Sequence, residues 1–117
     1  MAAAKYNITV EQGSHFNLVL TIKDPTPTPI DISTWTFSGQ IRKSPSDATA
    51  LADFTFTIQN QITNTGEVWV SLTDVETSAI PAECPSTNLV YDIEATVSGV
   101  VTRLIMGAAV LSAEVTR

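Results

Sequence analysis

The sequence has few of the side chains that covalent cross-linking and acid–base catalysis require. Cys84 is the only cysteine, which excludes a disulfide within the chain, so the fold depends on its apolar core or on neighbouring molecules. A chain without disulfides also suits assembly in a reducing cytoplasm. His15 is the only histidine, and it stands beside a Gly-Ser turn. Because a catalytic nucleophile needs a base oriented by a third group, and no such arrangement is evident, we expect a protein that is not an enzyme.

Charged residues are also scarce, basic ones most of all. Asp, Glu, Lys and Arg make up 15% of the chain, with 12 acidic against 6 basic residues and a net charge of −6. Nucleic acids and anionic lipid surfaces are bound first through Lys and Arg, so we expect neither nucleic acid nor a membrane as a partner. The basic residues are scattered along the sequence and predict no stripe. They are Lys5, Lys23, Arg42, Lys43, Arg103 and Arg117.

Long apolar runs, glycine-rich loops and acidic loop motifs are missing as well. No apolar run approaches the ~20 residues of a membrane helix, and Met1–Lys5 lacks the apolar stretch of a secretion signal, so we expect a protein made and used in soluble form. The five glycines are isolated and predict no phosphate-binding loop. The acidic pairs Asp74/Glu76 and Asp92/Glu94 fall short of the roughly six to eight oxygen ligands of a Ca²⁺ site. We therefore expect no metal and no cofactor.

The sequence does contain a strong period-two pattern in its last third. Apolar and polar residues alternate between Leu89 and Ser98, which is typical of a strand buried on one face. A second apolar run, Val100–Leu111, follows the Ser98-Gly99 turn, so the two runs predict one long hairpin. With 117 residues, of which 44% are apolar, we expect a single β-sandwich domain spanning residues 1–117.

Shorter alternating runs predict further strands upstream of this hairpin. Turn residues separate the runs about every 8 to 12 positions, which is typical of a β-sandwich. The segment 73–80 predicts one short helical turn, because Thr73 and Glu76 have capping-box spacing and Pro81 ends it. We therefore expect an all-β antiparallel sandwich of about seven strands, placed at residues 5–10, 16–23, 35–42, 53–59, 68–72, 89–97 and 100–111.

Two features of the predicted strands indicate contact with another chain. Trp69 falls on the face opposite Val68 and Val70, where it meets solvent unless a loop, the N-terminus or another chain covers it. The last strand is apolar on both faces, which implies cover beyond its own sandwich. A loop of the same chain or a subunit contact would each supply this cover. The candidate interface residues are Trp69, Met106, Ala108 and Val110.

A family resemblance rests on six short segments: Tyr6–Gly13, Pro29–Ser33, Gln40–Arg42, Tyr91–Glu94, Val101–Leu104 and Glu114–Arg117. Together they resemble small virion structural proteins of tailed bacteriophages, and the chain is similar to the immunoglobulin-like N-terminal domain of baseplate upper proteins. The resemblance covers nearly the whole chain. Family members usually carry polar residues where Met106, Ala108 and Val110 stand here, and this departure favours a packed contact on that surface.

The resemblance implies an immunoglobulin-like sandwich used for attachment or decoration, and it supplies no catalytic residue. We expect a non-enzymatic structural component of the virion, assembled in the host cytoplasm. It would dock on other virion proteins in the tail, neck or baseplate, in symmetric multicopy assembly. One alternative is a capsid decoration (cement) protein on the head. An alternative of another class is a host-surface or carbohydrate-binding module in which Trp69 stacks on a sugar.

Overall fold

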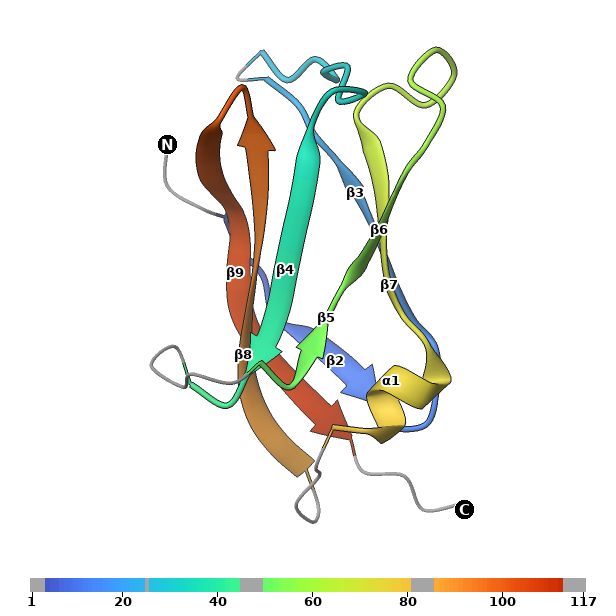
Figure 1. Cartoon of the computed structure of the whole chain (residues 1–117), viewed down its shortest axis with the longest axis vertical. Helices are drawn as coiled ribbons and strands as arrows, with labels where there is room; N and C mark the ends of the chain where they lie inside the picture. The colour runs from blue at the N-terminus through green and yellow to red at the C-terminus, as the bar shows by residue number, and fades with distance from the viewer. Residues whose placement is uncertain (1–3, 25, 45–49, 81–85, 113–117) are drawn as a thin grey trace.

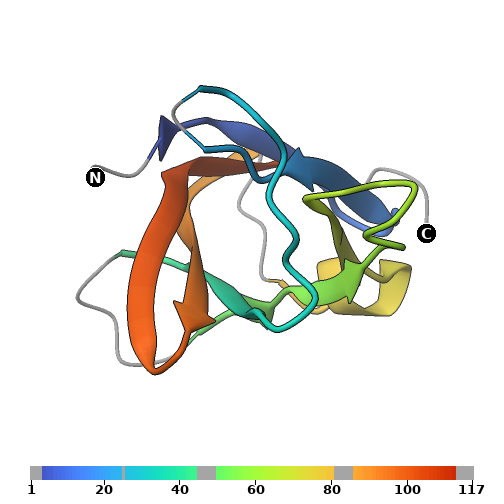
Figure 2. The same cartoon turned by 90° about the horizontal axis from the view of Figure 1, so that it is seen from above.

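The computed structural model describes residues 4–24, 26–44, 50–80 and 86–112, which form two β-sheets facing one another (Figures 1 and 2). The larger sheet has the order β1-β9-β8-β4-β5, with β2 also paired to β9, and the smaller has the order β3-β7-β6. The protein is therefore an immunoglobulin-like β-sandwich, as the sequence predicts. Its elements are β1 (Ala4–Lys5), β2 (Ile8–Glu11), β3 (Phe16–Thr21), β4 (Thr36–Arg42), β5 (Ala52–Asp53), β6 (Thr55–Ile58), β7 (Glu67–Leu72), α1 (Asp74–Ser78), β8 (Ser86–Val97) and β9 (Val100–Ser112).

The first strands depart from the expected antiparallel pairing. Both β1 and β2 run parallel to β9, with Lys5 opposite Met106 and Ile8 opposite Ala109. The single strand expected at 5–10 is therefore wrong in its continuity, because two residues interrupt it between β1 and β2. Among the described residues, seven strands have four or more residues, and β1 and β5 add two residues each.

The C-terminal hairpin forms as predicted and supplies the centre of the larger sheet. Ser98 and Gly99 make its turn with φ angles of 50° and 81°, and a two-residue hairpin turn that follows the twist of the strands needs such positive values. The alternating side chains of β8 behave as expected, since Tyr91, Ile93 and Ala95 are buried between the sheets. The period-two pattern thus gave the correct inward face of this strand.

Aromatic rings join the two sheets across the core. The ring centroid of Phe54 lies 6.1 Å from the centroids of both Phe16 and Tyr91. Trp35 is half-buried just before β4, and its ring centroid lies 6.2 Å from that of Phe37. Full burial of a side chain of this size stabilises a fold by about 1.5–3 kcal/mol, so the buried Phe54 and Tyr91 help to hold the two sheets together.

The strand expected at 53–59 is divided between the two sheets. Its first part belongs to β5, which pairs with β4, and its second part is β6, which pairs with β7. Phe54 lies at the crossing, where its backbone N–H donates to the carbonyl of Gly39 at 3.0 Å. A Cβ at Gly39 would lie 2.9 Å from the carbonyl oxygen of Asp92 and 3.0 Å from the Phe54 ring. Glycine at this position therefore lets the chain pass from one sheet to the other.

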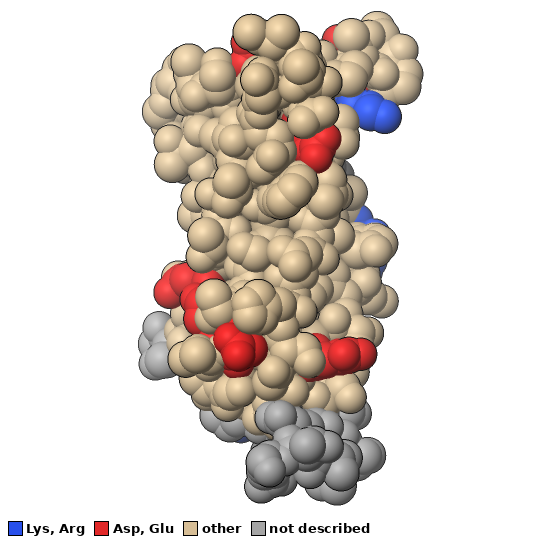
Figure 3. Space-filling view, turned by 90° about the vertical axis from the view of Figure 1, so that its right-hand side faces the viewer, with Lys and Arg blue, Asp and Glu red and all other residues tan. Residues whose placement is uncertain are grey.

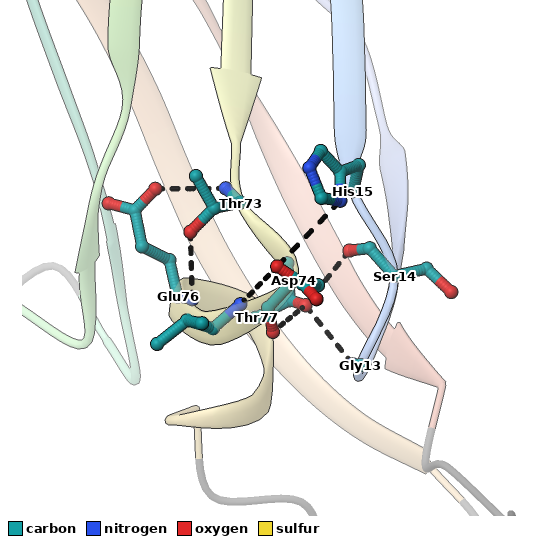
Figure 4. A network of polar contacts seen from close by, with 8 residues as sticks. Gly13, Ser14, His15, Thr73, Asp74, Glu76 and Thr77 are labelled. Carbon is teal, nitrogen blue, oxygen red and sulfur yellow. Dashed lines mark hydrogen bonds and ion pairs between the residues drawn. The ribbon is translucent and has the colours of Figure 1, made fainter.

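The short helix is fastened to the start of β3 by a buried threonine (Figure 4). The predicted capping box is present: the Thr73 hydroxyl accepts from the N–H of Glu76 at 3.1 Å, and the Glu76 carboxylate accepts from the N–H of Thr73 at 2.9 Å. Thr77 is fully buried, accepts from the N–H of Gly13 and donates to the carbonyl of Ser14. No helix in the described ranges is long and apolar enough to cross a membrane.

Candidate docking surface

The outer face of the larger sheet is hollowed into a groove of about 470 Å³, formed over β1, β9, β8 and β4. Its floor carries three apolar side chains from the two central strands, namely Val90, Met106 and Ala108. Met106 is 36% exposed, whereas its neighbours Ile105 and Ala109 are buried. The predicted outward direction of Met106 and Ala108 is therefore confirmed, and the fold places both residues in one groove.

Polar side chains from the flanking strands form the walls of the groove. Strand pairing aligns four lining residues in one row across the sheet: Lys5, Met106, Asp92 and Gln40. A second row lies beside it: Asn7, Ala108, Val90 and Arg42. The apolar floor thus lies between Lys5 and Asn7 on one side and Gln40 and Arg42 on the other. An apolar centre with a polar rim is the usual anatomy of a protein interface.

A break in strand register curves the sheet next to the groove. Ile93 of β8 pairs with Ile105, but the following residue, Glu94, pairs with Arg103. One residue of β9, Leu104, is therefore extra at this point. A bulge of this kind bends its strand and increases the local twist, so the end of the hairpin beyond Leu104 turns relative to the groove floor.

The N-terminal wall of the groove depends on a glycine within β9. A Cβ at Gly107 would collide with the carbonyl of Tyr6, so glycine allows the N-terminal segment to lie directly against β9. The Tyr91 hydroxyl donates to that same carbonyl at 2.5 Å, and the Tyr6 N–H donates to the carbonyl of Met106 at 2.9 Å. Burial, and secondly the phenol of Tyr6, raises the pKa of Tyr91 to about 12.

Sequence analysis missed this junction. The one local signal for it was a glycine inside an otherwise apolar strand, which often marks the close approach of another backbone. The partner backbone belongs to Tyr6, about a hundred residues earlier in the chain. The side chain of Asn7 completes the junction, because its oxygen accepts from the N–H of Ala108 at 3.0 Å where the strand pairing is interrupted. These contacts position Lys5 and Asn7 at the groove.

Basic residues that are scattered in the sequence come together here. The groove is lined by Lys5, Arg42 and Arg103 against a single carboxylate, that of Asp92. Three cations and one anion leave two net positive charges on the lining of a chain whose total charge is −6. Asp92 forms an ion pair with Arg103 at 3.3 Å, and Arg42 donates to the side-chain oxygen of Gln40 at 2.6 Å. Three of the six basic residues therefore line one groove, although they lie far apart in the sequence.

Val110, the third predicted outward residue of the last strand, lies beyond this groove. It pairs with Thr9 on one side and Asn88 on the other, and its side chain is half-buried. It is not among the residues that line the groove. The outward apolar face of β9 therefore continues past the groove, but with less exposure than at Met106.

Trp69 lies on the opposite side of the molecule, on the outer face of the smaller sheet. As predicted, it faces away from Val68 and Val70, which are fully buried. Its side chain is 46% exposed, so the described part of the chain leaves nearly half of it uncovered. The indole N–H donates to the carboxylate of Glu67 at 2.7 Å, and Val19, 55% exposed, is its pairing partner on β3. The fold thus separates Trp69 from the other three candidate residues.

The titratable residues considered for catalysis or metal binding are dispersed. The imidazole of His15 lies 3.9 Å from the carboxylate of Asp74, and both side chains are mostly exposed (Figure 4). Across the described ranges, no group of three or more His, Cys, Asp or Glu side chains is placed to hold a metal ion. Cys84 lies outside the described residues.

Comparison with known proteins gives a likeness of shape alone. No protein-family model and no curated protein matches the sequence. Among solved structures, the chain is similar to the NK cell receptor NKp44, a triggering partner in natural cytotoxicity. The identity is 15% and the TM-score is 0.41, and the match covers 97% of this chain and 100% of that chain. It is also similar to a sialyltransferase from Photobacterium damsela, with 8% identity, coverage of 95% of this chain and 18% of that chain, and a TM-score of 0.39.

A third similar structure is a nucleoside hydrolase-related hypothetical protein from Saccharophagus degradans that is associated with carbohydrate metabolism. It has 10% identity and a TM-score of 0.32, and the match covers 97% of this chain and 23% of that chain. This chain thus spans less than a quarter of the length of two of the three structures. Overlays this loose carry no argument about activity, and the candidate surface has to be judged on its own geometry.

Proposed function

We propose that this protein is a non-catalytic docking module of a tailed-phage particle, and that it joins a neighbouring virion protein through the groove on its larger sheet. The observation that carries this proposal is the apolar floor of Val90, Met106 and Ala108 between polar walls. Exposed apolar surface of this kind gains free energy when a partner removes it from water. The segments that resemble phage virion proteins support the assignment to a particle.

Repetition on a particle would make a modest interface durable. The groove has 11 lining residues, fewer than the roughly 20–30 residues that each side of a standard interface contributes. Many copies held on one symmetric particle bind with a high effective concentration, so weak individual contacts suffice. We place the module in the tail, neck or baseplate. The alternative, a decoration protein on the head lattice, predicts hundreds of copies per virion, which a quantitative stained gel of purified particles distinguishes.

The docking proposal is tested by placing a charge on the groove floor. Met106→Glu would replace an apolar side chain of the groove floor by a carboxylate that has to be desolvated when the partner docks, so we expect a folded protein that no longer enters particles. The matched control is Val101→Glu, which introduces the same charge on the same strand at a residue that is 60% exposed and outside the groove. Circular dichroism checks the fold of both variants. Normal incorporation of folded Met106→Glu would contradict the proposal.

A second candidate function rests on Trp69. Its half-exposed indole is held along β7 by the bond to Glu67, and a held aromatic ring offers a surface on which the apolar face of a sugar ring stacks. This supports a host-surface or carbohydrate-binding module. Titration with host polysaccharide would then change the tryptophan fluorescence, and Trp69→Ala would lose both the change and the binding. No spectral change at saturating polysaccharide would rule out this candidate.

A further inference from the structure

The molecule carries an apolar projection as well as an apolar groove. Ile62 lies in the loop between β6 and β7 and is 92% exposed, more than any other large apolar side chain in the described part of the chain. Single exposed apolar residues are common on protein surfaces, so exposure alone does not make Ile62 a contact residue. The construction of its loop and the charges around it add to the exposure.

The loop that carries Ile62 is braced by hydrogen bonds. The Ile62 N–H donates to the side-chain oxygen of Asn60 at 2.9 Å. The side-chain oxygen of Gln61 accepts from the N–H of Gly66 at 2.7 Å and from the N–H of Ile32, in the loop before β4, at 3.1 Å. A side chain on a preorganised backbone loses less conformational freedom when a partner covers it. The loop therefore presents Ile62 in a form suited to binding.

Acidic residues surround this projection. The segments 22–35 and 59–67, which the Gln61 side chain joins, contain Asp24, Asp31 and Glu67 but a single basic residue, Lys23. Figure 3 shows Asp and Glu atoms at this upper end of the molecule, whereas Lys and Arg atoms appear only along one margin. The projection is thus an apolar side chain on an acidic end of the sandwich.

The groove on the larger sheet has the opposite charge around an apolar floor. On its walls, Arg103 is matched by the carboxylate of Asp92. Lys5 forms no ion pair with any residue that the structure describes. A positive charge beside an apolar floor complements an apolar side chain flanked by carboxylates. The groove and the Ile62 loop therefore match in chemistry.

The projection cannot reach the groove of its own molecule. The groove lies on the outer face of the larger sheet, over Gln40 and Arg42 near the lower end of β4, whereas the loop between β6 and β7 is at the top of the smaller sheet (Figure 1). A contact between them has to join two molecules. Because the two surfaces differ, each copy would use its loop toward one neighbour and its groove toward another, which gives a ring where the rotation closes and a filament where it does not.

We propose that the partner in the groove is a second copy of this chain, whose loop 59–66 places Ile62 over the floor at Met106 and Ala108, beside Lys5. This inference rests on the proposed docking function and names its partner. On a particle the head-to-tail contact would hold a ring of identical modules. The modest size of each contact is then offset by the number of contacts in the ring.

Two variants of the full chain separate the two surfaces. Ile62→Glu loses the projection but keeps the groove, and Met106→Glu loses the groove floor but keeps the projection. We expect wild-type protein to form larger species as its concentration rises in analytical ultracentrifugation, and each variant alone to associate about tenfold more weakly or less. A mixture of the two variants should form a dimer and nothing larger, because only one contact remains possible. Val75→Glu, at a residue 74% exposed on α1, is the matched control and should associate like wild type.

NMR and charge variants identify the contact in that mixture. In Ile62→Glu protein labelled at its methionine methyl groups, addition of unlabelled Met106→Glu protein should shift the signal of Met106. Lys5→Met in the labelled protein should weaken the dimer about fivefold, and added salt should remove the difference by screening. Lys23→Met in the unlabelled protein removes a cation from the acidic end instead, so it should bind no more weakly.

The outcomes distinguish self-docking from docking in general. A wild-type chain that stays monomeric up to millimolar concentration, or Ile62→Glu protein that associates as well as wild type, would overturn the self-docking inference. Association that the mixture does not restore would also overturn it, because the contact would then be symmetric. If Met106→Glu is nevertheless excluded from particles, the docking function stands and the groove receives a different virion protein. If Met106→Glu enters particles normally, the docking function itself fails.

Discussion

The two outer faces of this sandwich differ in shape and in composition, although both are built from alternating strands. The larger sheet presents a groove with an apolar floor and net positive lining. The smaller sheet presents Trp69 and Val19, with the Glu67 carboxylate bonded to the Trp69 indole. Its strand pairing runs without a register shift from β3 through β7 to β6. The larger sheet has both a register shift and an interrupted first strand.

The difference shows that irregularities in strand pairing, rather than the residue pattern alone, create the hollow face. The bulge at Leu104 bends β9, and Gly107 admits the backbone of Tyr6 beside it. Both features act only on the larger sheet. A change at either feature should therefore alter the groove and leave the Trp69 face unchanged, which gives a way to test the comparison.

The largest effect is expected for Gly107→Ala. The added Cβ meets the Tyr6 carbonyl, which is backbone and has little room to move, so the N-terminal strands should separate from β9. We expect a loss of about 3 kcal/mol in the free energy of unfolding, measured by urea denaturation, together with loss of the groove. Gly99→Ala is the control, because nothing lies within 4 Å of a Cβ there, and its positive φ should cost only about 1 kcal/mol. Equal stability of the two variants would contradict the role given to Gly107.

An intermediate effect is expected at the end of the smaller sheet. Thr77→Val keeps the shape of a fully buried side chain but leaves the Gly13 N–H and the Ser14 carbonyl without their partner. Unmade buried bonds of this kind should lower the free energy of unfolding by about 2 kcal/mol. The methyl NMR signal of Met106 should stay in place, since the groove lies on the other sheet. A shift of that signal would show that the two faces are coupled.

The smallest effect is expected in the pH dependence of the Tyr6→Phe variant, in which Tyr91 is the sole tyrosine. Burial, the main cause of the raised pKa, persists in this variant, so tyrosinate absorbance should appear well above pH 10. The folded pKa of Tyr91 lies above the unfolded value of 10.0, so its contribution to stability is complete below pH 10 and is lost as the pH rises toward 12. Ionisation near pH 10 in the folded variant would mean that the Tyr91 hydroxyl is not buried at the junction.

Local pattern was enough to predict most of the strands. The alternation in 89–97 and the capping box at Thr73 both depend on near neighbours in sequence, and both are confirmed. The division of the segment 53–59 was not predictable in this way, because its cause is contact between Phe54 and Gly39 on another strand. Period-two alternation continues through the crossing, so the pattern gives no sign that the chain changes sheets.

The groove was only partly predictable for the same reason. The outward direction of Met106 and Ala108 followed from alternation within β9, and the structure confirms it. The gathering of Lys5, Arg42 and Arg103 depends on which strands become neighbours, and residues this far apart in sequence carry no local signal of it. Trp69 was correctly placed on an outer face, but its separation from the other candidates depends on the division into two sheets.

The position of Lys5 within the groove wall has a practical consequence for anyone producing this protein. An affinity tag or fluorescent fusion attached ahead of Met1 would be joined to the chain only a few residues from Lys5 and Asn7. It would therefore lie beside the groove floor at Met106. Such a tag would cover the groove and interfere with an assay of partner binding. The Ser98-Gly99 tip of the hairpin is outside the groove lining, so a small label inserted there would report on binding without obstructing it.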